Sequence, residues 1–148
     1  MGRALRQAWL AGSRGEVPVG AVLMDGADGR IIGQAGNETI GANDPTAHAE
    51  ILAIRQGAAL AGNHRLPGAV LVVTLEPCLM CLGAMVQARI GGLVFAARDP
   101  KAGAVVSNLH GLGLSFLNHR FPVLEGVLAE ECGRTLSRFF AARRKQRG

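Results

Sequence analysis

Residues 69–81 read AVLVVTLEPCLMC, an apolar run followed by a proline and two closely spaced cysteines. The run over residues 69–74 is typical of a strand that is buried on both faces of a sheet. Pro77 suits the first turn of a helix, because that position needs no N–H donor. The sequence therefore predicts a buried strand that leads directly into a helix over residues 78–89.

The segments around this unit alternate between strand and helix signals. Further strands are predicted over residues 20–24 and 31–32, which form a hairpin around DGADG, and over residues 92–97 and 122–127. Further helices are predicted over residues 3–13, from a cap at Asp44 or Thr46 to about Gly62, and from about Ala129 onward. This order predicts one α/β domain over residues 1–148, a three-layer α/β/α sandwich around a central mixed sheet of about five strands.

The composition is that of an ordinary folded protein. Of the 148 residues, 49% are hydrophobic and 18% are charged, unlike a disordered chain. No apolar run approaches the ~20 residues of a membrane span, and the first residues lack a signal-peptide pattern. The three cysteines are an odd number, and two are too close in sequence to staple a fold. We therefore expect a cytoplasmic protein without a membrane partner.

Three side chains have the character of zinc ligands. Cys78 and Cys81 are three residues apart, which places them on one face of the predicted helix. The positive end of the helix dipole lowers thiol pKa values there and favours thiolates, which zinc prefers. His48, near another predicted helix start, is the third candidate ligand.

A zinc site with three protein ligands is typical of a catalytic zinc, whereas a structural zinc has four protein ligands. Three protein ligands leave the fourth position of zinc for water, which metal binding acidifies. Glu50, two residues after His48, is then placed to shuttle protons. Two alternatives stay open. In the first, the two cysteines are a redox pair, but this interpretation does not explain the HxE motif upstream. In the second, the zinc is structural and has a fourth protein ligand, for which the candidates are Cys132, His64, His110 and His119.

The HxE and PCxxC motifs together are typical of zinc nucleobase deaminases, and longer stretches resemble one family of them. These stretches are EVPVGAVL (16–23), NDPTAHAEILAIRQG (43–57), TLEPCLMCLGAM (74–85), RIGGLVFAARDPKAGA (89–104) and LNHR (117–120). They are similar to bacterial tRNA adenosine deaminases, which convert the wobble adenosine of an anticodon to inosine. The similarity runs from about Arg6 to Arg144. It implies the cytidine deaminase-like fold, one Zn²⁺ per subunit, a homodimer and a tRNA anticodon stem-loop as substrate.

The resemblance also implies roles for individual residues. It makes His48, Cys78 and Cys81 the zinc ligands and Glu50 the catalytic proton shuttle. It implies RNA contacts from Asn37, Ala97, Asp99, Lys101, His119, Phe140, Arg143 and Arg144. Local alternatives stay open for some of these residues: Asn37 could end the hairpin strand, Asp99 could belong to a turn, and His119 could brace its own loop.

The charge pattern and the substrate leave further alternatives. The net charge is +5, and the last fifteen residues contain no acid but six basic residues, Arg134, Arg138, Arg143, Arg144, Lys145 and Arg147. This run fits a phosphate-binding edge or a solvated helix end equally well. Two rival functions remain, a deaminase of a free base or nucleoside such as guanine or cytidine, and an RNA-binding module with a structural zinc. Small cytidine deaminases typically have PCGxC where this chain has PCLMC.

Overall fold

The computed structural model describes residues 1–146, which form a five-stranded sheet with helices on both faces. The elements are α1 (Gly2–Ser13), β1 (Gly20–Met24), β2 (Ile31–Gly36), α2 (Ala49–Ala61), β3 (Val70–Leu75), α3 (Leu79–Ala88), β4 (Gly92–Ala97), η1 (Gly111–Gly113), β5 (Val123–Glu125) and α4 (Ala129–Gln146). The strand order is β2-β1-β3-β4-β5, with β1 antiparallel to both neighbours and β3, β4 and β5 parallel. The predicted mixed sheet is confirmed.

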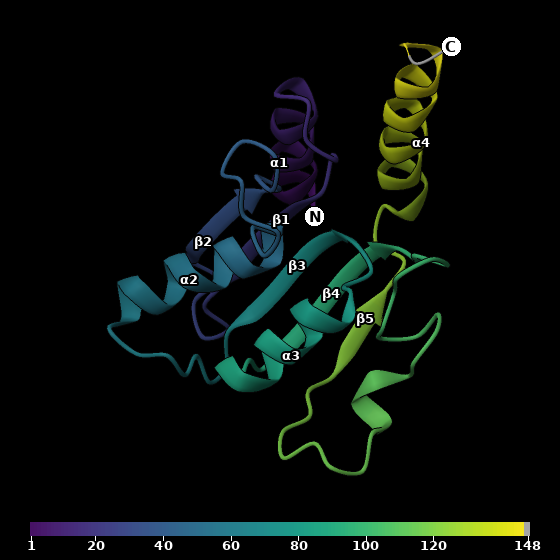
Figure 1. Cartoon of the computed structure of the whole chain (residues 1–148). Coiled ribbons are helices and arrows are strands. Elements are labelled where there is room, and N and C mark those ends of the chain that lie inside the picture. Colours follow the sequence, from purple (N-terminus) through teal and green to yellow (C-terminus); the bar gives the residue numbers. More distant parts are fainter. Residues whose placement is uncertain (147–148) are drawn as a thin grey trace.

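The two faces of the sheet are covered by different helices, because alternate strand residues point in opposite directions. Leu23 and Leu71 belong to the main core, which they share with apolar residues of α2 and α3. Val22 points the other way and packs against Ala4 of α1, and Cys132 of α4 is buried beside α1. In Figure 1, α2 and α3 cross the near face of the sheet, whereas α1 and α4 stand together at its upper end. The three-layer sandwich is confirmed.

The contact between α1 and β1 depends on a residue without a side chain. A Cβ atom at Gly20 would lie 2.0 Å from the carbonyl oxygen of Ala4 and 2.5 Å from the backbone nitrogen of Ala8. Neither backbone atom can move without shifting α1. The close approach of this helix to the sheet therefore requires glycine at the start of β1.

We expect Gly20→Ala to lower the free energy of unfolding by at least about 1–3 kcal/mol, the usual cost of overpacking a core. Gly83→Ala in α3 is the matched control, because nothing lies within 4 Å of a Cβ atom there. Alanine is favoured over glycine within a helix, so the control should gain about 0.5–1 kcal/mol. Urea denaturation of both variants measures these changes, and a Gly20→Ala protein as stable as the wild type would contradict the packing described.

The helix α2 begins later than the sequence predicts. Asp44 does not cap α2; its carboxylate accepts hydrogen bonds from the N–H and the hydroxyl of Thr46 and closes a separate turn. The N-cap of α2 is His48, and Asn37 Oδ1 accepts the Ala49 N–H at 2.9 Å. Both predicted caps are therefore wrong, because the capping oxygen comes from the end of β2.

The remaining expectations hold with small shifts. α3 begins at Leu79, so Pro77 lies before the helix and not in its first turn. The segment between β4 and β5 is irregular except for η1, as its glycine content predicts. No helix among residues 1–146 combines the length and apolar character that are needed to cross a membrane.

Candidate metal centre and active site

Two helix starts meet at one end of the sheet and bring three ligand side chains together. His48 is the N-cap of α2, Cys78 is the N-cap of α3, and both have an extended backbone. Cys81 follows in the first turn of α3. His48 Nδ1 lies 3.6 Å from the sulfur of Cys78 and 3.5 Å from that of Cys81. One ligand atom from each residue falls within 4.8 Å of the others, so the group could hold a metal ion.

The candidate fourth ligands lie elsewhere. Within residues 1–146, the metal-ligating group contains no fourth side chain. Cys132 is buried beside α1, on the other side of the sheet. His119 Nε2 donates a hydrogen bond to the carbonyl oxygen of Ile90 at 2.7 Å, which commits that side chain to bracing its loop. The three-ligand arrangement thus leaves one side of the site free of protein ligands.

Hydrogen bonds among the three candidate ligands shift their pKa values. The Cys81 thiol donates a hydrogen bond to Cys78 and lowers the pKa of Cys78 to about 4. The same hydrogen bond, together with burial, raises the pKa of Cys81. The hydrogen bond to Cys78 raises the pKa of His48. The two sulfurs therefore share one proton, which a bound cation would displace because metals bind thiolates.

Glu50 lies in the first turn of α2 and is 4% exposed. Burial raises the pKa of its carboxyl to about 7, although the nearby His48 opposes this shift. A carboxyl group with a pKa close to neutral both accepts and donates a proton readily. Asn37 is also buried and holds the start of α2 through the Ala49 N–H, so it orients the turn that carries Glu50.

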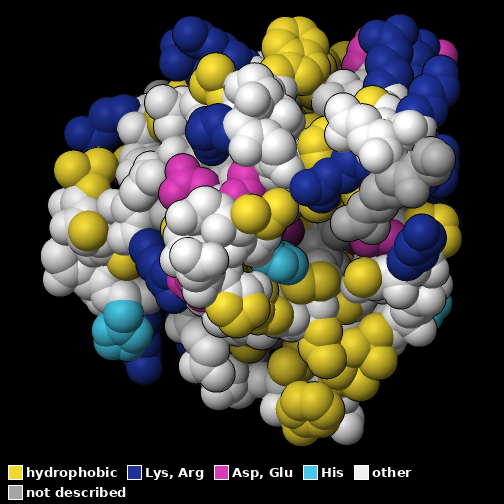
Figure 2. All heavy atoms as spheres, turned by 45° about the horizontal axis from the view of Figure 1, so that its top comes forward, with side chains coloured by type: hydrophobic (Ala, Val, Ile, Leu, Met, Phe, Trp, Pro, Cys, Tyr) yellow, Lys and Arg dark blue, Asp and Glu magenta, His cyan; other side chains and the backbone are white. Residues whose placement is uncertain are grey.

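A groove of about 700 Å³ runs between the loop after β4 and one face of α4. Five of the residues expected to contact RNA line it, namely Ala97, Asp99, Lys101, Phe140 and Arg144. They come from two segments that are far apart in the sequence. Figure 2 shows Lys and Arg side chains at the upper right and right of the molecule, above a hydrophobic area at the lower right, and others spread over its left side. The structure therefore places most of the expected RNA contacts on one surface.

Comparison with known proteins identifies the family. Residues 1–144 match the MafB19-like deaminase family. A tRNA-specific adenosine deaminase of Haemophilus influenzae is 51% identical over 144 residues, which are 97% of this chain and 83% of that protein. The chain belongs to the tRNA-specific adenosine deaminases.

Solved structures place this deaminase among two groups of related enzymes. A structure from a study of A-to-I editing by tRNA:A34 deaminases at the wobble position of transfer RNA has a TM-score of 0.89 and 47% identity, covering 92% of this chain and 97% of that one. A guanine deaminase from Bacillus subtilis has a TM-score of 0.63 and 32% identity, covering 97% and 90%. Both share the fold, so the fold alone does not decide the substrate.

Asp99 and Arg143, two of the residues expected to touch RNA, also have contacts within the protein. Asp99 Oδ1 accepts the N–H of Lys101 and closes a turn, as its local sequence predicts. Arg143 lies 5.1 Å from the ring centre of Phe139, which itself meets the ring of Phe140 edge-on. Phe139 is half-buried. Arg147, part of the predicted basic run, lies outside the described residues.

Two buried carboxylates escape the sequence-based predictions. Glu16 accepts hydrogen bonds from the N–H groups of Ile40 and Gly41 and so anchors the loop that leads to His48. Glu76 accepts several hydrogen bonds from the loop after β4. The only sequence signal for either residue is an acid beside an apolar stretch, which does not reveal partners more than twenty residues away.

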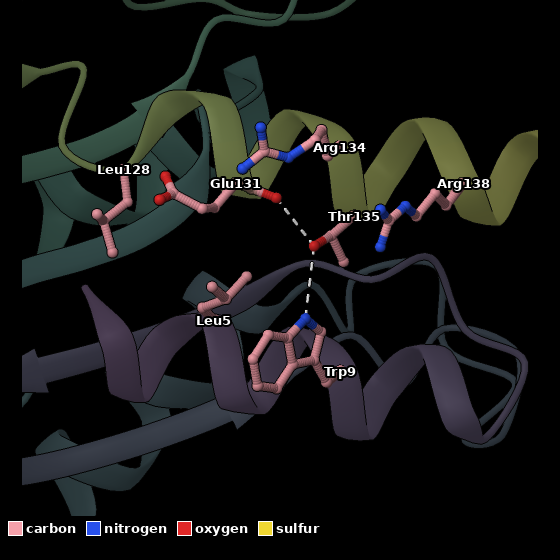
Figure 3. A pocket seen from close by; sticks show the side chains of 7 residues that line it. All are labelled: Leu5, Trp9, Leu128, Glu131, Arg134, Thr135 and Arg138. Atoms are coloured by element: carbon pink, nitrogen blue, oxygen red, sulfur yellow. Dashed lines mark hydrogen bonds between the residues drawn. The ribbon is translucent and has the colours of Figure 1, made fainter.

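A second groove lies on the opposite side of α4 (Figure 3). It is about 630 Å³ and separates α4 from α1. Trp9 is 59% exposed there and donates a hydrogen bond from Nε1 to the hydroxyl of Thr135 at 3.4 Å. Arg138 lines this groove, whereas Arg144 lines the groove on the other side. The basic residues of α4 therefore do not form one surface.

Proposed function

We propose that this deaminase converts the wobble adenosine of a tRNA anticodon to inosine by zinc-dependent hydrolysis, in the cytoplasm, as one domain over residues 1–148. The observation that carries the proposal is the shared groove of Ala97, Asp99, Lys101, Phe140 and Arg144. A basic and aromatic groove suits an RNA loop, whose unpaired bases stack on aromatic rings while its phosphates meet cations.

The proposal of zinc rests on the geometry of the ligands. Zinc bonds of about 2.3 Å to sulfur and about 2.0–2.1 Å to nitrogen, at a tetrahedral angle, separate these atoms by about 3.5–3.6 Å. In the structure, the sulfurs of Cys78 and Cys81 lie 3.6 Å and 3.5 Å from His48 Nδ1. Both separations from His48 fit zinc, and all three ligand atoms lie within 4.8 Å of one another. When bound, zinc would serve as a Lewis acid that activates water for attack at C6 of the purine.

Glu50 would carry the protons of the reaction. Its carboxylate would take one proton from water and deliver it to N1 of the base, and it would then take the second proton from the hydroxyl added at C6 and pass it to the departing amine, which leaves as ammonia. The pKa of about 7 suits both roles near neutral pH. The N–H groups at the start of α3, whose N-cap is Cys78, would be available to stabilise a developing oxyanion. Asn37 would hydrogen-bond the flipped nucleotide beside the start of α2.

Phe140 would contact the nucleotides that the flipped base leaves behind. Its side chain is 43% exposed on the groove, although it is large and apolar. An unpaired base can cover such a ring by stacking. Anticodon loops present unpaired bases, so the cost of extruding one is small compared with a duplex.

The alternative function is deamination of a free base such as guanine, which the likeness to guanine deaminase favours. The two functions are separated by measuring ammonia release from an anticodon stem-loop, free adenosine and free guanine under the same conditions. The proposal requires a strong preference for the stem-loop. Comparable turnover of free guanine would reject it, because a free-base enzyme has no need of the basic groove.

Salt dependence tests the role of the C-terminal cations. Replacing Arg143, Arg144 and Lys145 together by alanine should leave up to three phosphates without a cation from the last turn of α4. The slope of log K against log salt should fall by about 0.7 for each phosphate that is no longer neutralised. The apparent KM should rise while saturating turnover changes little, since these side chains are remote from the chemistry.

The two grooves of α4 provide a matched control for this experiment. Arg144→Ala and Arg138→Ala each remove one cation from the same helix, but only Arg144 lines the proposed RNA groove. We expect a reduced salt slope for Arg144→Ala and a smaller change for Arg138→Ala. An unchanged salt slope and an unchanged KM in the triple variant would show that these basic residues do not bind phosphates and only form a solvated helix end.

We also propose that the protein is a homodimer. An apolar groove of about 310 Å³ on the outer side of α2 and α3, lined by Ile51, Ile54 and Ala84, supports this proposal. The large apolar side chain of Leu79, in the first turn of α3, is exposed to solvent in the single chain. Light scattering during gel filtration tests the proposal, and a monomer at micromolar concentration would contradict it.

A further inference from the structure

Glu76, in the turn between β3 and α3, is a buried carboxylate with no part in the proposed chemistry. It is 2% exposed, although carboxylates are rarely buried without several partners. It precedes the metal-ligating segment, yet its hydrogen bonds run to the loop of residues 99–107. This loop follows β4 and carries four of the residues that line the proposed RNA groove, among them Asp99 and Lys101.

The hydrogen bonds of Glu76 gather both ends of that loop. Oε1 accepts the N–H groups of Val106 at 2.7 Å and Ser107 at 2.8 Å. Oε2 accepts the N–H of Asp99 at 3.0 Å and the hydroxyl of Ser107. The loop has no helix or strand of its own. Three of its backbone N–H groups, those of Asp99, Val106 and Ser107, therefore depend on this one carboxylate, much as those of a helix start depend on a cap.

The loop is also fitted around Glu76 by shape. A Cβ atom at Gly103 would lie 2.4 Å from the Glu76 carboxylate and 2.6 Å from the carbonyl oxygen of Asp99. The N–H of Ala104 donates to the carbonyl oxygen of Pro77 at 2.9 Å, which ties the loop to the turn before α3. The loop thus closes over the carboxylate with no space for a side chain at its middle.

We propose that Glu76 is a positioning residue that holds residues 99–107 in the shape with which Asp99 and Lys101 face RNA. The proposal rests on the proposed function, because it assigns this loop to RNA binding. It separates two tasks that adjoin in the sequence: Cys78 and Cys81 serve the metal, whereas Glu76 serves the substrate surface.

The chemistry of the site demands a carboxylate. Ionised glutamate only accepts hydrogen bonds, and both of its oxygens are used. Glutamine has the same shape but replaces one oxygen by a donor. In either orientation of the amide, its nitrogen faces at least one of the three backbone N–H groups. Glu76→Gln should therefore release part of the loop, although it changes only one atom.

Lysine-specific proteolysis measures the loop without RNA. The chain contains two lysines, Lys101 in the loop and Lys145 near the end of α4. Cleavage of a folded protein requires local opening, so its rate reports how well a segment is held. We expect Glu76→Gln to speed cleavage after Lys101 by about tenfold or more, while cleavage after Lys145 keeps its rate. Glu16→Gln, which removes an equally buried carboxylate from another loop, should leave the Lys101 rate unchanged.

Binding and metal content complete the test. We expect Glu76→Gln to raise KM for an anticodon stem-loop by about tenfold, to change saturating turnover much less and to retain one zinc per chain. If this variant does not fold, Ser107→Ala removes one donor and should give smaller changes in the same direction. Unchanged Lys101 cleavage and KM would overturn the proposal, and so would loss of zinc, which would assign Glu76 to the metal helix. If the wild-type protein does not act on RNA, the proposed function is rejected instead. The cleavage rate after Lys101 would still show whether Glu76 holds the loop in place.

Discussion

Glu50→Gln is expected to keep its zinc and its fold and to lose about 10²–10⁴-fold in turnover of the wobble adenosine, the usual contribution of a positioned proton-transfer group. Glutamine fills the same buried space but cannot accept the proton from water or return it to N1. Glu50→Ala should lose as much, and the agreement of the two variants would exclude a purely steric effect.

Elemental analysis, thermal unfolding and single-turnover kinetics on the same preparations check this expectation. The metal should stay because the Glu50 carboxylate is not part of the group formed by His48, Cys78 and Cys81. A Glu50→Gln protein with wild-type turnover would mean that another residue shuttles the protons. Loss of zinc in this variant would make Glu50 a ligand.

The second large effect concerns the metal ligands. His48→Ala, Cys78→Ala and Cys81→Ala should each lose bound zinc and all measurable deamination, because two protein ligands remain where three are needed. Cys132→Ala is the matched control. It removes the third cysteine, which is buried beside α1 and away from the metal group.

The control should lose some stability through the cavity it creates, by about 1 kcal/mol or more, but should keep one zinc per chain and full activity. Zinc content is measured by elemental analysis after extensive dialysis. Full zinc occupancy in Cys78→Ala would contradict the assignment of the site.

The fold could largely be predicted from local patterns. The apolar run over residues 69–74 corresponds to β3 with a shift of one residue, because a strand buried on both faces has a strong signal. The start of α2 could not be predicted, because the oxygen of Asn37 that caps it comes from the end of another strand. Asp44 has the residue type of a cap but uses its carboxylate in a turn with Thr46.

The metal site was predictable for a similar reason. Cys78 and Cys81 are close in sequence, and His48 and Glu50 form one short motif, so each half has a local signal. Their meeting depends on two helix starts at one end of the sheet, which the alternation of strands and helices implies. Glu76 had no such signal, because its partners lie in an irregular loop with no period.

The C-terminal charges show what structure adds to a sequence pattern. Net charge alone left phosphate binding and a solvated helix end equally plausible. The structure assigns Arg144 and Phe140 to the groove that Lys101 also lines, and Arg138 to the opposite groove beside Trp9. The helical period of α4 explains the division, because residues six apart lie on different faces.

The central claim is that this chain edits one adenosine in RNA, and one measurement tests it most directly. The zinc-loaded protein is incubated with an anticodon stem-loop that carries adenosine at the wobble position, and the product is digested and analysed for inosine by mass spectrometry. A second stem-loop with guanosine at that position and adenosines elsewhere shows whether the reaction is confined to the wobble site. We predict inosine from the first RNA and none from the second. Absence of inosine from the first RNA, with ammonia released from free guanine by the same protein, would contradict the account.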